Sequence, residues 1–126
     1  MSTQPQIVVV DDDQGVRRSL QLFLRGHGYR VRSYADARSL LTDPDARCAA
    51  LLVADYRMPG SDGFEICRAL RDTGWNGAAV LITGFGDSEI RASAQSDGFV
   101  AVLDKPVRPS LLLRVARDAV TRADDS

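Results

Sequence analysis

Five runs of apolar residues recur along the chain, and most of them end in polar or turn-forming residues. Runs that are apolar at every position are typical of interior strands of a parallel sheet, because helices cover both faces of such a sheet. The second run differs, since Arg30 and Arg32 alternate with Val31 and Ser33, and this pattern favours an edge strand. The predicted strands are residues 7–10, 29–34, 51–55, 78–83 and 99–103.

Between these runs, apolar residues recur every three or four positions, as they do on the buried face of an amphipathic helix. In the first segment Val16, Leu20 and Phe23 share one face, and Asp13 can cap the helix. The fourth segment carries only Ile90 and two alanines, so it should be the least firmly held helix. The predicted helices follow Asp13, run from Asp36 to about Pro44, from about Phe64 to Gly74 and from Asp87 to Ser96, and begin at Pro109.

Strands and helices alternate along the whole chain, which indicates an open parallel sheet with right-handed crossovers and helices on both faces. We therefore expect an α/β, flavodoxin-like fold. It should be a doubly wound five-stranded parallel sheet of strand order 2-1-3-4-5 with five helices. One domain should span residues 7–122, between tails at residues 1–6 and 123–126.

The composition, with 44% hydrophobic and 26% charged residues, is that of an ordinary globular protein. The formal net charge of -1 offers no general attraction to nucleic acid or to an anionic membrane. No apolar run approaches the ~20 residues of a membrane span, and residues 1–6 lack the apolar core of a secretory signal. We therefore expect a cytoplasmic protein that binds neither nucleic acid nor membrane directly. Cys48 and Cys67 lack metal-site spacing and are predicted to be reduced, structural thiols.

Polar residues end four of the predicted strands. Asp11 and Asp12 follow the first strand, Asp55 ends the third, Thr83 ends the fourth, and Lys105, the single lysine of the chain, follows the fifth. The predicted strand order makes these four strand ends neighbours, so their side chains should lie together at one edge of the sheet. Three carboxylates there would repel one another unless a cation lay among them, and oxygen ligands without histidine or cysteine fit Mg²⁺.

This set of groups suits phosphoryl transfer. An aspartate carboxylate can act as a nucleophile and form an aspartyl phosphate. Mg²⁺, an ammonium group and a hydroxyl group can stabilise the charge that spreads over the phosphoryl oxygens during transfer. The sequence thus predicts Asp55 as the nucleophile and Thr83 and Lys105 as stabilising groups.

Four motifs follow one another at these strand ends: VVDDD (residues 9–13), DYRMPGSDG (residues 55–63), LITG (residues 81–84) and DKP (residues 104–106). With them the chain resembles the receiver domains of two-component response regulators, from residue 6 to about residue 122. The resemblance implies a phosphorylation-dependent signalling switch and not an enzyme. A sensor histidine kinase or a phosphotransfer protein would supply the phosphoryl group.

The resemblance also implies roles for the site residues. Asp55 would be both the phosphoacceptor and a Mg²⁺ ligand, Asp12 a direct Mg²⁺ ligand and Asp11 a ligand through water. The backbone carbonyl of Arg57 would be a further Mg²⁺ ligand, and the peptide bond before Pro106 would be cis. Signalling would pass through the face of the fourth helix, fifth strand and fifth helix, which could also hold a second copy or an output domain.

Thr83 and Lys105 would contact the phosphoryl oxygens. Receivers often have Tyr or Phe three residues before this lysine, and its ring reports phosphorylation, but this chain has Val102 there. Phe99 should not replace that ring, because residues an odd number apart on a strand face opposite sides. We expect Thr83 and residues 84–87 to move on phosphorylation and to bias the fourth helix.

Three alternative functions can be compared with this one. A haloacid-dehalogenase-like phosphatase also uses an aspartate at a strand end, but it needs an acid two residues later, where this chain has Arg57. A flavodoxin-like nucleotide carrier is disfavoured because residues 11–13 would repel phosphate. A degenerate receiver that acts as a phosphorylation-independent interaction module is disfavoured because no charged site residue is missing.

Overall fold

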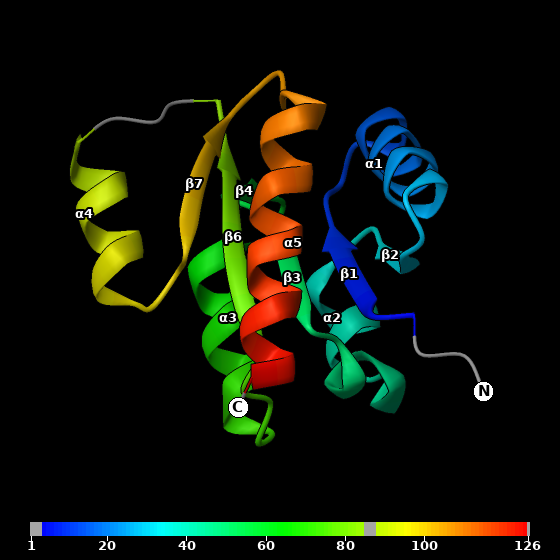
Figure 1. The fold of residues 1–126 in the computed structure, drawn as a ribbon. Coiled ribbons are helices and arrows are strands. Elements are labelled where there is room, and N and C mark those ends of the chain that lie inside the picture. Colours follow the sequence, from blue (N-terminus) through cyan, green and yellow to red (C-terminus); the bar gives the residue numbers. More distant parts are fainter. Residues whose placement is uncertain (1–3, 85–87, 126) are drawn as a thin grey trace.

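A computed structural model describes residues 4–84 and 88–125. Its centre is a parallel five-stranded sheet in the order β2-β1-β3-β6-β7 (Figure 1). Two further short strands pair only with each other, so this is the predicted order 2-1-3-4-5, and the predicted fold is confirmed. The sheet strands are β1 (Gln6–Val10), β2 (Arg30–Tyr34), β3 (Leu51–Asp55), β6 (Ala78–Thr83) and β7 (Ala101–Asp104).

Helices cover both faces of the sheet (Figure 1). Leu24 and Leu112 belong to a core that the first and last helices form against one face. Leu40, Ile66 and Ala94 bring the other three helices to the opposite face. The helices are α1 (Gln14–Gly26), α2 (Ala37–Leu41), α3 (Gly63–Asp72), α4 (Ser88–Ser96) and α5 (Pro109–Asp125).

The strands β1 and β3 are buried along their whole length. Successive residues of each strand enter opposite cores: Val8 and Leu52 pack with α2 and α3, whereas Ile7 and Leu51 pack with α1 and α5. This two-sided burial follows from runs that are apolar at every position. It also makes the carboxyl ends of these strands rigid supports for whatever follows them.

Some element boundaries differ from the sequence prediction. The helix α2 ends at Leu41, and a separate 3-10 helix, η1 (Pro44–Cys48), begins at the proline, because proline fits the first position of a helical turn but not its interior. At the chain ends, Gln6 already pairs with β2, and α5 continues through Asp125, since no glycine or proline interrupts it after Pro109.

The segment after β3 forms a small hairpin of β4 (Arg57–Met58) and β5 (Ser61–Asp62). Gly60 lies at its turn with φ of 78°, a conformation that favours glycine. The predicted turn at residues 60–63 therefore closes a two-stranded ribbon and then leads into α3.

The helix α4 lies beside the edge strand β7 and buries little, as the sequence predicts (Figure 1). Ala94 is its one buried residue. Polar contacts hold it as well, because the Arg91 guanidinium donates to Asp104 at the end of β7 (2.8 Å). The predicted helix start at Asp87 lies outside the described residues. Across the part of the chain that the structure describes, no helix is long and apolar enough to cross a membrane.

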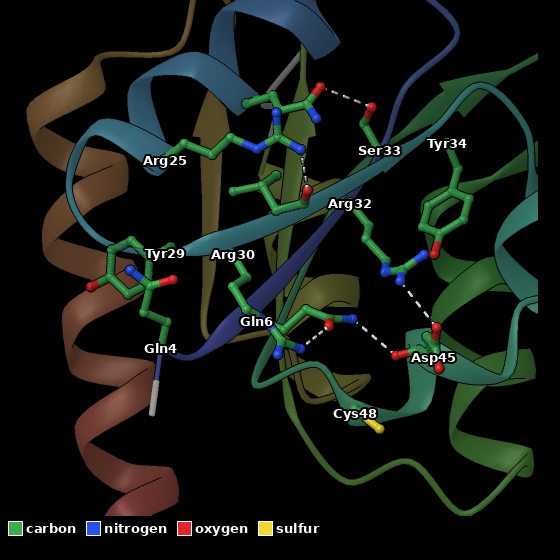
Figure 2. Close-up of a pocket in the computed structure, with 12 residues that line it drawn as sticks. Gln4, Gln6, Arg25, Tyr29, Arg30, Arg32, Ser33, Tyr34, Asp45 and Cys48 are labelled. Carbon is green, nitrogen blue, oxygen red and sulfur yellow. Dashed lines mark hydrogen bonds and ion pairs between the residues drawn. The ribbon is translucent and has the colours of Figure 1, made fainter. Parts of the chain in front are cut away.

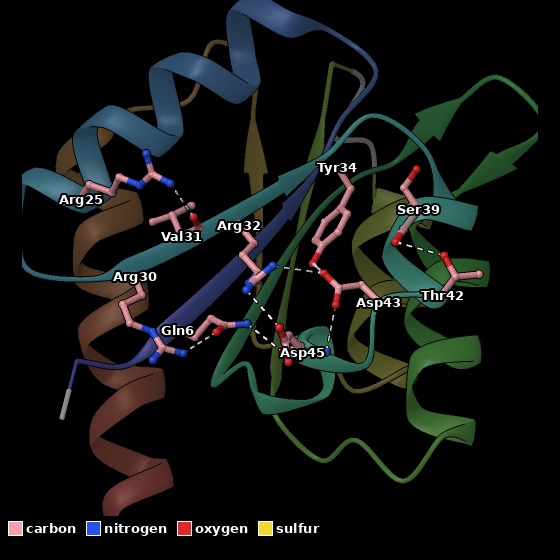
Figure 3. Close-up of polar contacts among 10 residues, drawn as sticks. All are labelled: Gln6, Arg25, Arg30, Val31, Arg32, Tyr34, Ser39, Thr42, Asp43 and Asp45. Carbon is pink, nitrogen blue, oxygen red and sulfur yellow. Dashed lines mark hydrogen bonds and ion pairs between the residues drawn. The ribbon is translucent and has the colours of Figure 1, made fainter. Parts of the chain in front are cut away.

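The edge strand β2 is tied to the loop before η1 by polar side chains (Figure 3). Arg32 bridges Asp43 (3.4 Å) and Asp45 (3.0 Å), and the Tyr34 hydroxyl donates to Asp43 (2.6 Å). The hydrogen bond from Tyr34 holds the pKa of the Asp43 carboxyl below its usual range.

We expect Tyr34→Phe to reduce stability in a pH-dependent way. A carboxyl whose pKa is lowered by folding contributes stability above its unfolded pKa of about 3.9 and loses it as the pH falls through its folded pKa. The difference in unfolding free energy between wild type and Tyr34→Phe should therefore be full near pH 7 and shrink towards about pH 2. Urea unfolding across this range measures it, and a difference that does not change with pH would contradict the proposed cause.

Candidate functional site

The carboxyl ends of β1, β3, β6 and β7 meet at one edge of the sheet, as the strand order requires. Asp55 and Thr83 are the last residues of β3 and β6, and Asp11 and Lys105 directly follow β1 and β7. Together these strand ends surround an open cavity of ≈ 310 Å³. Its lining residues are Asp12, Asp13, Asp55, Tyr56, Arg57, Thr83, Gly84 and Lys105.

Asp55 is a buried carboxylate on a fixed backbone. The residue is 5% exposed. Its strand pairs with β6 in a register that places Asp55 opposite Ile82. The next residue, Tyr56, continues this pairing, because its N–H donates to the Ile82 carbonyl (2.7 Å). The polar tip is thus held by the sheet itself and not by a loop.

Gly63, the first residue of α3, packs directly under this strand end. A Cβ atom at this position would lie 2.9 Å from the Asp55 carbonyl oxygen and 2.6 Å from the Leu81 side chain. Only a glycine allows the helix to start so close to the backbone of Asp55.

We expect Gly63→Ala to lower the free energy of unfolding by about 1–3 kcal/mol, since the strand end or the helix must shift. Urea unfolding measures the loss. The matched control is Gly26→Ala, at the end of α1, where a Cβ would meet nothing within 4 Å. There alanine should be neutral or stabilising by up to about 1 kcal/mol. Equal effects of the two substitutions would show that close packing at Gly63 is not the cause.

Three carboxylates form an acidic cluster at the cavity. One oxygen from each of Asp11, Asp12 and Asp55 lies within 4.8 Å of the others. Asp11 is buried, whereas Asp12 is exposed to the cavity. Burial raises the pKa of Asp11, the hydrogen bond from the Asp13 N–H (2.9 Å) opposes this, and the negative charge of Asp55 adds to it.

The cluster fits a divalent cation of the Mg²⁺ type. Among the described residues, the buried Oδ2 atom of Asp11 has no hydrogen-bond partner. A buried carboxylate oxygen without a hydrogen bond is costly, and the Lys105 ammonium at 3.6 Å meets this need only in part. A cation among the three carboxylates would complete the neutralisation. The donor set contains only oxygen, which suits Mg²⁺ better than zinc or copper.

Lys105 supplies the positive charge of the site. Its Nζ atom lies 3.1 Å from Asp55 Oδ2 and 3.6 Å from Asp11 Oδ2. Burial alone would lower the pKa of Lys105, but the hydrogen bond to Asp55 and the charges of both aspartates outweigh it, so the pKa lies above its usual value. The Lys105–Pro106 peptide bond is cis, as the resemblance implies, and the Lys105 N–H donates to the Thr83 carbonyl (2.9 Å).

The structure brings the predicted site residues together: all but Asp11 line this cavity, and the buried Asp11 joins them through the carboxylate cluster. Thr83 is 1% exposed and stands in the cavity wall beside Gly84. Arg57 also lines the cavity, with its guanidinium carbon 5.6 Å from the centre of the Tyr56 ring. The role of the Arg57 carbonyl as a metal ligand stays a prediction.

Two further features of the site, the contact of Arg17 and the place of Asp13 in the cavity wall, did not follow from the sequence. The Arg17 guanidinium donates to the Asp11 carbonyl (2.7 Å) and so fixes the end of β1 against α1. Asp13 both lines the cavity and caps α1 by accepting from the Val16 N–H (3.1 Å), of which the cap was predicted. The position of Arg17, four residues after the cap, is a weak signal for its contact with Asp11.

The prediction that Phe99 and Val102 face opposite sides of a strand is wrong. Both pack on the core formed with α2, α3 and α4. Strand β7 begins only at Ala101, so Phe99 precedes it and the alternation of a strand does not apply there. The Phe99 ring contacts that of Phe64 edge-to-face, with ring centres 5.5 Å apart.

The chain is similar to known regulatory proteins over its whole length. Residues 7–117 match the family model described as response regulator receiver domain. The chain is 33% identical to the transcriptional regulatory protein FixJ of Rhizobium meliloti, covering 98% of this chain and 58% of FixJ. It is also 33% identical to the C4-dicarboxylate transport transcriptional regulatory protein DctD of the same organism, covering 94% of this chain and 26% of DctD.

A solved structure agrees with the sequence relatives. The crystal structure of FixJ-N is 32% identical to the chain with a TM-score of 0.81, covering 93% of this chain and 94% of that one. The chain thus spans only part of the curated regulators that it matches, and its matched part contains the strand-end cavity. The chain belongs to the response regulator receiver domain family, whose members are regulatory phosphoacceptor domains and not classical enzymes.

Proposed function

We propose that this domain accepts a phosphoryl group on Asp55 and that the phosphorylated form signals to a partner. The observation that carries the proposal is the position of the Asp55 carboxylate, held by the sheet 3.1 Å from the Lys105 ammonium and beside two further aspartates. A structural ion pair would need one carboxylate for one ammonium. The two additional carboxylates are explained by a divalent cation, which could in turn bind a phosphoryl group.

In the proposed reaction, a carboxylate oxygen of Asp55 attacks phosphorus, and the bond from phosphorus to the leaving group breaks. The leaving group keeps the bonding electron pair. Asp55 reacts as the carboxylate, so no proton has to be removed from it. Lys105 would then pair with a phosphoryl oxygen, and Thr83 would donate a hydrogen bond to another. Asp12, Asp55 and the Arg57 carbonyl would hold Mg²⁺, with Asp11 acting through water, and the bound cation would neutralise charge on the phosphoryl oxygens.

The phosphoryl donor would be a sensor histidine kinase or a phosphotransfer protein. A second cavity of ≈ 600 Å³ lies beside Lys105, between α1 and the segment that follows β7. It is lined by apolar groups, including those of Val16, Leu20, Pro106 and Val107. A partner seated there would bring its own phosphorylated side chain to the Asp55 cavity. FixJ and DctD are named as transcriptional regulators, so we assign the output of this domain to a transcriptional response.

Signalling would pass through the face of α4, β7 and α5, where a second copy or an output domain would bind. Aromatic rings connect the Asp55 cavity to this region. Tyr56 lines the cavity, its ring stands edge-to-face to Phe64 (5.7 Å between centres), and Phe64 contacts Phe99. The Phe99 N–H donates to the Ala94 carbonyl of α4 (2.9 Å). This path would report phosphorylation in place of the aromatic ring that many receivers have at the position of Val102. It would act together with the predicted movement of Thr83 and residues 84–87. Residues 85–87 lie outside the described residues.

We expect Phe64→Leu to uncouple phosphorylation from α4. Leucine keeps the site apolar but removes both ring contacts, so phosphorylation should proceed while the accompanying shifts of α4 backbone NMR signals fall to about half or less. The control is Phe23→Leu on α1, whose ring contacts His27 on the other face of the sheet and should leave those shifts unchanged. Undiminished α4 shifts in Phe64→Leu would exclude the aromatic path.

The proposed function is tested by incubating the wild-type domain with a small acyl phosphate donor and Mg²⁺, followed by intact mass measurement. We expect a gain of one phosphoryl group that is lost on treatment with hydroxylamine, because acyl phosphates react with strong nucleophiles. No mass gain would contradict the proposal and favour a phosphorylation-independent interaction module instead.

A further inference from the structure

The outer edge of β2 has no neighbouring strand among residues 4–84 and 88–125. β2 is the first strand in the sheet order and, within these residues, pairs with β1 alone, in parallel. An open groove of ≈ 950 Å³ runs along this edge, with α1 on one side and η1 on the other (Figure 2). The groove is remote from the Asp55 cavity, and the two share no lining residue.

Backbone hydrogen-bonding groups point into this groove. The Arg30 N–H donates to the Pro5 carbonyl (2.9 Å) and the Tyr34 carbonyl accepts from the Asp11 N–H (3.1 Å), so these residues turn their backbone groups towards β1. Alternate residues of a strand point in opposite directions, and Val31 and Ser33 therefore turn theirs outward. The Val31 carbonyl accepts from the Arg25 guanidinium (3.0 Å), which confirms this orientation.

Three of these outward groups are available to a ligand. Among the described residues, the N–H of Val31 and both the N–H and the carbonyl of Ser33 have no hydrogen-bond partner. Their spacing, two residues apart along an extended chain, is the pattern that an added strand satisfies. A compact small molecule would not satisfy groups that lie along the strand in this way.

The charged side chains that line the groove are mainly basic, although the chain as a whole carries a net charge of -1. Arg25 lies on the α1 side and Arg30 and Arg32 on the η1 side, and Asp45 is the acidic residue that lines the groove (Figure 2). Arg32 is bridged to carboxylates, but Arg25 bonds a backbone carbonyl and Arg30 bonds the Gln6 side chain (2.6 Å). The positive charges of Arg25 and Arg30 are thus solvated by neutral groups and not cancelled.

We propose that the outer edge of β2 binds an extended acidic segment of a partner protein, which adds to the sheet as a sixth strand. The backbone of the segment would pair with Val31 and Ser33. Its carboxylates would meet Arg30 and Arg25 on the two sides of the new strand, with Arg25 released from the Val31 carbonyl as the segment replaces it.

The same charges disfavour a second copy of this chain as the occupant. Pairing of two β2 edges would bring the arginines of both copies together, and like charges across paired strands are destabilising. Basic side chains on an edge strand are a common guard against such self-association. The arginines of β2 would not repel an acidic strand, so such a strand can pair with this edge.

The test uses the isotope-labelled chain and two capped seven-residue peptides, one alternating glutamate with valine and one alternating lysine with valine. At low ionic strength we expect the glutamate peptide to shift the Val31 and Ser33 amide NMR signals saturably and the lysine peptide to leave them unchanged. Added salt should weaken the binding. Asp55→Asn should bind the peptide like the wild type, which separates this proposal from the proposed phosphorylation.

Two changes distinguish strand pairing from charge attraction alone. A glutamate peptide methylated on every backbone nitrogen keeps its charge but cannot donate, and it should bind at least about tenfold more weakly. Ser33→Pro removes an N–H that faces outward, together with the Ser33 hydroxyl that donates to Gln21 (3.3 Å), and should cause a similar loss. Arg30→Gln should weaken binding and Arg114→Gln on α5 should not. Equal binding of the methylated peptide, equal binding of the lysine peptide, or dimerisation through β2 would overturn the proposal.

Discussion

Asp55→Asn is expected to gain no phosphoryl group under conditions in which the wild type gains one. The amide of asparagine is not a nucleophile at this position, and the neighbouring aspartates do not replace it. Asp11 is buried and held by the Asp13 N–H and Lys105, and Asp12 follows β1 and not the strand that ends at the cavity with Asp55. Intact mass after incubation with an acyl phosphate and Mg²⁺ measures the result directly.

Folding and acceptor identity can be separated in this experiment. Asn is close to Asp in shape, so Asp55→Asn should keep the sheet, and removal of one of three clustered carboxylates relieves like-charge repulsion. The matched control is Asp118→Asn on α5, an exposed carboxylate remote from the cavity, which should be phosphorylated like the wild type. If Asp55→Asn still gains the phosphoryl group, the acceptor is another residue and the proposed role of Asp55 is wrong.

The location of the site follows from the sequence because interior strands must be apolar along their whole length. The polar residue that ends such a run marks the point where the chain leaves the sheet. Asp55 and Thr83 are therefore the last residues of their strands, and the strand order brings them next to Asp11 and Lys105. Local pattern and topology together are sufficient to place a site built on strand ends.

Contacts that depend on how elements approach one another do not follow in this way. An apolar run does not mark where strand pairing begins, so Phe99 was assigned to the wrong side of the sheet, although it packs with Val102 and Phe64. The same holds at the β2 edge. There the Gln6 amide donates to the Asp45 carbonyl across 39 residues of sequence, a contact that no local pattern predicts.

Asp12→Asn is expected to abolish the effect of Mg²⁺ on this domain. On the function proposed above, Mg²⁺ would bind the folded acidic cluster and not the unfolded chain, so it should stabilise the wild type by about 2.7 kcal/mol at 100 times its dissociation constant. Without Asp12 the cluster loses the carboxylate that is exposed to the cavity, and this gain should disappear. Phosphorylation from the small donor should fall about 100-fold, the loss expected when a stabiliser of transition-state charge is removed.

Thermal unfolding with Mg²⁺ and with a chelator provides a readout that does not depend on phosphorylation. The wild type should melt several degrees higher with Mg²⁺, and Asp12→Asn should melt at one temperature in both. Metal-free Asp12→Asn should be at least as stable as the metal-free wild type, because a carboxylate is removed from beside Asp11 and Asp55. A lower stability would instead mean that Asp12 serves the fold, and an unchanged response to Mg²⁺ would move the metal ligand elsewhere. Stability gained together with loss of the metal response identifies Asp12 as a residue kept for function at the expense of the fold.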